Sequence, residues 1–216
     1  LLYAETGAAG SGGGITVTVT GALELTSGSE ISTASAGQGG GVRISAGSLS
    51  ADAAGGIASI TTSAFGTGAG PALSLDVQGL LSLAGGADVT TYASAFGPAG
   101  DLAVRAGALR LQGLDPQVPT TIRSVGNAGA MNIVVTGALE LGGGTSISSS
   151  NQGDLAAGAL SVRAGSLTLA GGGRVAGIDS LAVGTGRGAD VGVEVAGAAT
   201  VTEGGWISAA TFGPAD

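Results

Sequence analysis

Apolar and polar residues alternate along most of this chain in short runs. Within residues 137–165, Leu139 and Leu141 alternate with polar or small residues before a Gly-Gly-Gly turn. A second run passes through Ile147, and a third run through Val162 follows a loop rich in Gly and Ala. Alternation with a period of two is typical of half-buried β-strands, whereas no window combines helical spacing with helix caps. The pattern therefore predicts an all-β protein with three short strands in this stretch.

Approximate copies of residues 137–165 recur through the chain. Each copy has a glycine directly before its first strand, and these anchor glycines are Gly21, Gly47, Gly79, Gly107, Gly137, Gly165 and Gly197. Successive anchors lie 26, 32, 28, 30, 28 and 32 residues apart, so the repeat is about 29 residues long. Residues 1–216 are therefore predicted to form one repeat segment, with a partial rung over 1–20, rungs starting at 21, 47, 79, 107, 137 and 165, and a partial rung over 197–216.

Three strands per repeat, joined by turns too loose for tight hairpins, predict a parallel β-helix. In such a coil, equivalent positions form columns along rungs that stack about 4.8 Å apart. In every second repeat, the apolar residues before the anchor glycine are displaced by one position. A displacement of one residue exchanges the two faces of a strand, so neighbouring repeats must differ in their turns. This predicts a two-rung super-repeat of about 58 residues. Three rungs of about 19 residues would also fit 58, but the strand pattern itself recurs at about 29.

The same alternation predicts which side chains point inward. The predicted core consists of Leu23, Leu25, Ile31, Val42, Ile44, Leu102, Val104, Leu139, Leu141, Ile147, Leu160 and Val162. Outward positions carry mainly Ser, Thr, Glu and Arg. The abundance of Ala and β-branched residues, with only 3% aromatic residues, suits the narrow interior of such a coil.

Composition narrows the classes of function. The 216 residues include 45 Gly but no Cys, His or Lys, which removes disulfides and the commonest soft metal ligands, so no metal or cofactor is expected. The net charge of -8 disfavours nucleic acid and anionic membranes as partners. No apolar run approaches the roughly 18 to 20 residues that a membrane span needs. The chain begins at Leu1 without a signal-like segment, so we expect it to be part of a longer chain.

Residues 21–50 and 137–169 contain a Gly-x-Leu-x-Leu strand and an Ile-Ser-rich strand, and Phe-Gly loops recur at 64–70, 95–100 and 211–215. This repeat pattern resembles the filamentous-haemagglutinin-like exoproteins, the secreted partners of bacterial two-partner secretion. The resemblance covers essentially the whole chain, although the secretion domain of that family is not visible in these residues.

The resemblance implies a right-handed parallel β-helix and export through an outer-membrane transporter. It also implies an extracellular location on the bacterial cell surface, and a structural or adhesive role in a filament or adhesin. The expected partners are other copies of the chain and cell-surface or matrix components, glycans among them.

Other classes of function fit the sequence less well. The first alternative is a carbohydrate-active β-helix enzyme, a lyase or hydrolase. Such an enzyme needs clustered carboxylates, but the acidic residues are scattered and no Lys or His accompanies them, so no enzyme activity and no catalytic residue are predicted. A carbohydrate-binding module is the second alternative. The calcium-binding nonapeptide is absent, and residues 186–190 lack its ligands. An ice-binding face would need a sustained Thr-x-Thr row, whereas the threonines at 16–20 are local.

Three groups of surface residues are candidates for contacts. Arg43, Arg105 and Arg163 recur in every second rung and predict either a cationic row for acidic glycans or, more simply, solvated side chains. The aromatic residues Phe65, Phe96 and Phe212 share one loop position, and they are expected to fill a corner, although exposed rings there would suit stacking on a carbohydrate. The irregular segment 114–119 replaces the usual glycine turn, and its candidate contact residues are Asp115, Pro116 and Gln117.

Overall fold

The computed structural model describes residues 1–6, 12–36, 39–94, 97–113 and 118–212. All the regular secondary structure in these ranges is β, and the strands stack in parallel as a solenoid of about seven turns. About 29 residues separate stacked strands, as between Ile31, Ile60 and Val89. The prediction of a parallel β-helix with this repeat is confirmed. None of the described ranges forms a helix that could cross a membrane.

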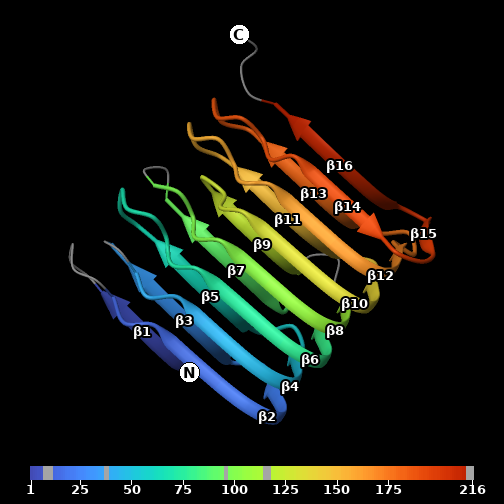
Figure 1. Cartoon of the computed structure of the whole chain (residues 1–216), viewed down its shortest axis with the longest axis horizontal. Coiled ribbons are helices and arrows are strands. Elements are labelled where there is room, and N and C mark those ends of the chain that lie inside the picture. The colour runs from blue at the N-terminus through green and yellow to red at the C-terminus, as the bar shows by residue number, and fades with distance from the viewer. Residues whose placement is uncertain (7–11, 37–38, 95–96, 114–117, 213–216) are drawn as a thin grey trace.

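The strands form two sheets that face each other across the interior (Figure 1). The short-strand sheet consists, in spatial order, of β1 (Leu2–Thr6), β3 (Ser29–Ser35), β5 (Ala58–Ala64), β7 (Asp88–Ala93), β9 (Thr120–Gly126), β11 (Thr145–Asn151), β13 (Ala176–Ala182) and β16 (Gly205–Thr211). The long-strand sheet consists of β2 (Ile15–Leu25), β4 (Val42–Asp52), β6 (Leu73–Ala84), β8 (Leu102–Gln112), β10 (Met131–Leu141), β12 (Leu160–Ala170) and β14 (Val191–Val195), with β15 (Ala199–Thr202) also beside β12.

The long strands differ from the prediction of three strands per turn. Strand β12, for example, runs from Leu160 to Ala170 straight through the anchor Gly165. The strands predicted before and after each anchor glycine are thus two halves of one bent strand, except in the last turn, where β14 and β15 are separate. Each anchor glycine lies at a corner of the solenoid and does not open a new strand.

A β-bulge at alternate corners accounts for the shift in apolar parity. Val135 of β10 pairs with Ala164 of β12, and Ala138 pairs with Ser166, so Thr136 and Gly137 lie opposite Gly165 alone. One extra residue of this kind is what a β-bulge inserts. Strands β2 and β6 carry the same extra residue relative to β4. Bulged and regular corners therefore alternate, which is the structural basis of the two-rung super-repeat.

Every corner except that at Gly21 needs glycine, because adjacent turns approach closely there. A Cβ atom at Gly165 would lie 2.6 Å from the carbonyl oxygen of Thr136 in the turn below. Real Cβ atoms do not come this close to an oxygen, so any side chain at this position would push the two turns apart. Glycine at this corner thus lets the two turns stack closely.

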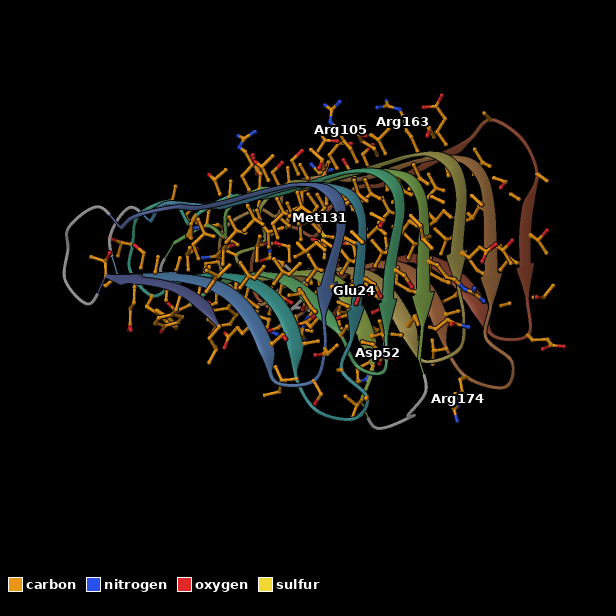
Figure 2. The ribbon with its side chains drawn as sticks, turned by 90° about the horizontal axis from the view of Figure 1, so that it is seen from below. Glu24, Asp52, Arg105, Met131, Arg163 and Arg174 are labelled. Atoms are coloured by element: carbon orange, nitrogen blue, oxygen red, sulfur yellow. The ribbon has the colours of Figure 1, made fainter. Side chains whose placement is uncertain are left out.

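The core lies between the two sheets, where Met131 is seen between the two layers (Figure 2). All the residues predicted to point inward are buried except Leu23, which is half-buried and packs against the core. The central turns add further buried leucines, including Leu73, Leu75, Leu81, Leu83, Leu109 and Leu111. Equivalent residues of successive turns stack in register, so the core is a set of continuous apolar columns.

One interior column is made of hydroxyl residues. Thr33, Thr62, Thr91, Ser124, Ser149 and Ser180 stack in register along the inner face of the short-strand sheet. All six are buried. The Oγ atom of Ser180 accepts a hydrogen bond from the Ala189 N–H group at 3.1 Å. The side-chain oxygens of the other five have no hydrogen-bond partner within the described part of the chain.

Candidate functional site

The outer face of the short-strand sheet carries two adjoining columns of outward side chains. One column runs through Ser32, Thr61, Thr90, Arg123, Ser148, Asp179 and Ser208. The other runs through Glu30, Ser59, Asp88, Thr121, Ser146, Gly177 and Trp206. Two clusters of contacts form where these columns meet, and the sequence pattern did not predict either of them.

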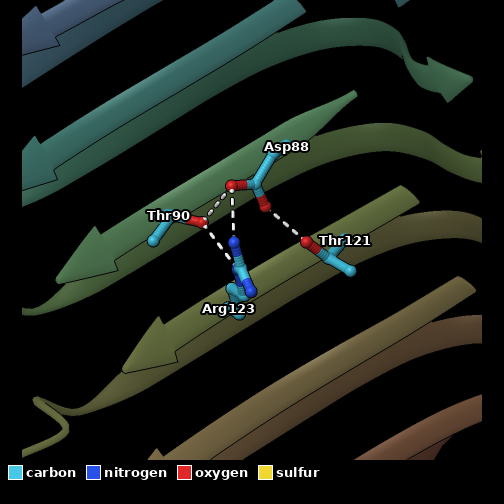
Figure 3. A network of polar contacts seen from close by, with 4 residues as sticks. All are labelled: Asp88, Thr90, Thr121 and Arg123. Carbon is cyan, nitrogen blue, oxygen red and sulfur yellow. Dashed lines mark hydrogen bonds and ion pairs between the residues drawn. The ribbon is translucent and has the colours of Figure 1, made fainter. Parts of the chain in front are cut away.

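The first cluster centres on Asp88 (Figure 3). Its carboxylate accepts hydrogen bonds from the Thr90 hydroxyl at 2.6 Å, from the Thr121 hydroxyl, and from Arg123 Nη2 at 3.2 Å. The Nε–H group of Arg123 also donates to Thr90 Oγ1 at 3.1 Å. Three of the roughly four hydrogen bonds that the carboxylate can accept are made inside the cluster, so the arrangement acts as a clamp between strands β7 and β9.

The second cluster centres on Trp206 of β16. Trp206 pairs with Gly177 of β13, and a Cβ atom at Gly177 would collide with indole atoms Nε1, Cδ1 and Cε2. The indole therefore lies across Gly177, which is buried although it points outward. The Trp206 side chain is 45% exposed, so part of the indole remains open to solvent.

A shallow depression of about 280 Å³ adjoins this indole, and we call it the Trp206 depression. Its lining residues are Pro119, Gly144, Thr145, Ser146, Ser148, Val175, Asp179 and Trp206. The hydroxyl of Ser148 donates a hydrogen bond to Asp179 Oδ2 at 3.2 Å. Partial burial raises the pKa of Asp179 above its usual value, although the Ser148 hydrogen bond opposes this shift.

The predicted row of arginines is wrong in one respect. Arg105 and Arg163 lie in one column of the long-strand sheet, separated by Val134, and both project from its outer side (Figure 2). Arg43 lies in a different column, where it pairs with Thr16. The column of a residue depends on how many residues separate it from the corner glycine of its strand. Arg43 lies four residues before Gly47, whereas Arg105 lies two residues before Gly107.

The arginine column also carries acidic residues. The Arg163 Nε atom lies 2.9 Å from Glu194 Oε2, and both side chains are exposed. Asp76 precedes Arg105 in the same column. The column therefore carries both signs of charge, with an acidic residue beside each arginine. Exposed ion pairs contribute at most about 1 kcal/mol each to stability. Such a surface is not a continuous cationic strip for acidic glycans.

Two of the three aromatic loop residues, Phe65 and Phe212, do not fill a corner. Phe65 and Phe212 are exposed, and the ring centroid of Phe65 lies 6.1 Å from that of Tyr92. The expectation of a packed corner aromatic is therefore wrong at these two positions. Phe96 and the candidate contact residues Asp115, Pro116 and Gln117 lie outside the described residues.

Carboxylates do not gather on the surface in the described ranges. No group of three or more acidic residues there is placed to hold a metal ion. Glu24 and Glu140 occupy one outward column, but Ser50, Ser82 and Arg110 lie between them. Four turns at about 4.8 Å place the two glutamates about 19 Å apart, beyond the roughly 5 to 10 Å that a glycosidase carboxylate pair requires.

Comparison of the chain with protein-family models, with curated proteins and with solved structures gave no match. The similarity to filamentous-haemagglutinin-like repeats therefore stays a prediction from the repeat pattern.

Proposed function

We propose that this chain is a structural and adhesive segment of a secreted β-helical filament or adhesin on the cell surface. It acts through rigidity, reach and attachment to other copies or to surface components. One observation supports this role above the others: equivalent turns stack in register through the described part of the chain, with continuous core columns. A solenoid of this kind gains length by adding turns, and each added turn extends the existing core.

The architecture favours a stiff rod. Every inner strand of both sheets pairs with the strands one turn before and one turn after it, so backbone hydrogen bonds run along the axis on two sides of the molecule. Corner glycines bring adjacent turns into direct contact. The outer faces carry mostly small polar side chains, which leaves them free to meet solvent or a partner surface.

Electron microscopy of intact cells tests the location and shape. Antibodies raised against this segment, detected with gold, are expected to label rods that project from the surface of the source organism. Rods purified by the same antibody are expected to diffract at about 4.8 Å along their axis. Label confined to the cell interior, or bound to compact particles, would contradict the proposal.

Adhesion is tested with beads coated with the purified chain. We expect these beads to attach to one another or to cells of the source organism. The matched control is a coating of the Val162→Asp variant, because Val162 is buried and an unpaired carboxylate there would unfold the turns around it. Equal attachment by both coatings would show that the solenoid surface has no part in adhesion.

A further inference from the structure

The indole of Trp206 is partly exposed on the outer face of the short-strand sheet. Trp206 is the only tryptophan in the chain. The indole lies over Gly177, where any larger residue would collide with it, and beside a depression. Tryptophan normally buries a large apolar area, so a solvent-facing indole beside a depression is a common sign of a binding surface.

Polar groups stand at fixed spacings beside the indole. Ser146 pairs with Gly177, and Ser148 pairs with Asp179, so these four positions form a small grid on two neighbouring strands. Neighbouring strands lie about 4.8 Å apart, and alternate residues along a strand lie about 6.6 Å apart. Asp179 accepts one hydrogen bond from Ser148, whereas an ionised carboxylate can accept about four. The Asp179 carboxylate can therefore accept further hydrogen bonds beside the indole.

We propose that the Trp206 depression binds a neutral pyranose ring of a saccharide. One face of the sugar, which presents C–H groups, stacks on the exposed indole. Sugar hydroxyls donate to the Asp179 carboxylate and exchange hydrogen bonds with Ser146 and Ser148. Hydrogen bonds to an ionised acceptor are stronger than neutral ones, so Asp179 supplies most of the polar recognition.

Charge and lining chemistry define the ligand class. Among the described residues, those that line the depression include Asp179 and no arginine, and the net charge of -8 repels acidic sugars. An organic cation is the competing ligand, because indole and carboxylate both attract positive charge. The hydroxyls of Ser146 and Ser148 favour a ligand that carries hydroxyl groups of its own.

This proposal names a ligand class for an attachment surface, and in that sense it rests on the proposed function. The two are tested separately. Sugar binding is measured on the purified chain, whereas rod formation and surface location are measured on cells, so failure of one leaves the other result intact.

Fluorescence titration tests the site directly, since all tryptophan emission of this chain comes from Trp206. The 216-residue chain is titrated with glucose, galactose, mannose, N-acetylglucosamine and their short oligomers. We expect a saturable change in emission with at least one of these sugars. Asp179→Asn is expected to weaken binding by about tenfold, because a neutral amide replaces the charged acceptor.

The matched control is Asp76→Asn, which removes an exposed carboxylate from the long-strand sheet and is expected to leave binding unchanged. Circular dichroism confirms that both variants are folded. Three results would overturn the proposal: no saturable change with any sugar, equal weakening by the two variants, or saturation by tetramethylammonium in place of a sugar.

Discussion

Arg123 and Asp88 link two adjacent turns of the solenoid diagonally, with Arg123 Nη2 3.2 Å from Asp88 Oδ2. Asp88 pairs in register with Thr121, 33 residues later, whereas Ile60 and Val89 in the preceding turn are 29 residues apart. The clamp thus fixes the register of β9 against β7, where the paired residues are 33 positions apart in the chain instead of 29. Register matters here because a slip would exchange the inward and outward faces of the strand.

Removing each partner of this clamp is expected to have unequal effects. Arg123→Ala loses a partly exposed ion pair and should lower the free energy of unfolding by less than about 1 kcal/mol. Asp88→Ala removes the acceptor of Thr90 and Thr121, both of which are buried, and should cost about 1 to 3 kcal/mol. Urea denaturation of both variants measures the difference. Equal losses would show that the two hydroxyls do not depend on the carboxylate.

Corner glycines provide a second test. Gly165→Ala places a methyl group against the carbonyl oxygen of Thr136, and we expect a loss of about 1 to 3 kcal/mol. Gly21→Ala is the matched control, because a Cβ atom there meets nothing within 4 Å. Its effect should stay within about 0.5 kcal/mol. If thermal or urea unfolding shows similar losses for both variants, close stacking is not the reason for glycine at the corners.

Replacement of two fully buried threonines by valine is expected to change the free energy of unfolding in opposite directions. Thr62 Oγ1 has no hydrogen-bond partner in the described ranges, so Thr62→Val should raise the free energy of unfolding by about 1 kcal/mol. Thr120 Oγ1 donates to the Gln112 carbonyl and accepts from the Gly86 N–H group. Thr120→Val should therefore cost about 1 to 3 kcal/mol. A comparable loss for Thr62→Val would mean that its hydroxyl binds an ordered water.

The raised pKa of Asp179 predicts that the stability of the protein depends on pH. Burial raises its folded-state pKa above the usual 3.8, so the folded protein binds a proton more tightly than the unfolded chain does. The stability linked to this group is therefore fully present below pH 3.8 and is lost as the pH rises through the raised pKa. Asp179→Asn should be more stable than the native protein at neutral pH, and the advantage should shrink in acid. Denaturation curves across the acid range test this, and an advantage that does not change with pH would refute it.

The apolar alternation was sufficient to predict the fold, because residues such as Leu139 and Leu141 reveal their inward direction within a single strand. It could not distinguish a bend from a turn at Gly137, since a small residue suits both. The contacts on the outer face depend on which residues stack one turn apart. Trp206 and Gly177 are 29 residues apart, and Arg123 and Asp88 are 35 apart, so their contacts follow from the register of each turn, which the alternation alone did not determine.

The ladder of the solenoid also determines how it bears force. Its strands lie across the axis, so the hydrogen bonds between turns run roughly along it, with the slant of a parallel ladder. Tension spread over a whole end of the rod loads every bond between two turns at once, and the rod resists it. Tension applied through a single chain end loads only the bonds of the last strand, which then unzips turn by turn. Such a rod would resist tension that is spread over many strands, and it would unfold readily when tension acts on a single chain end.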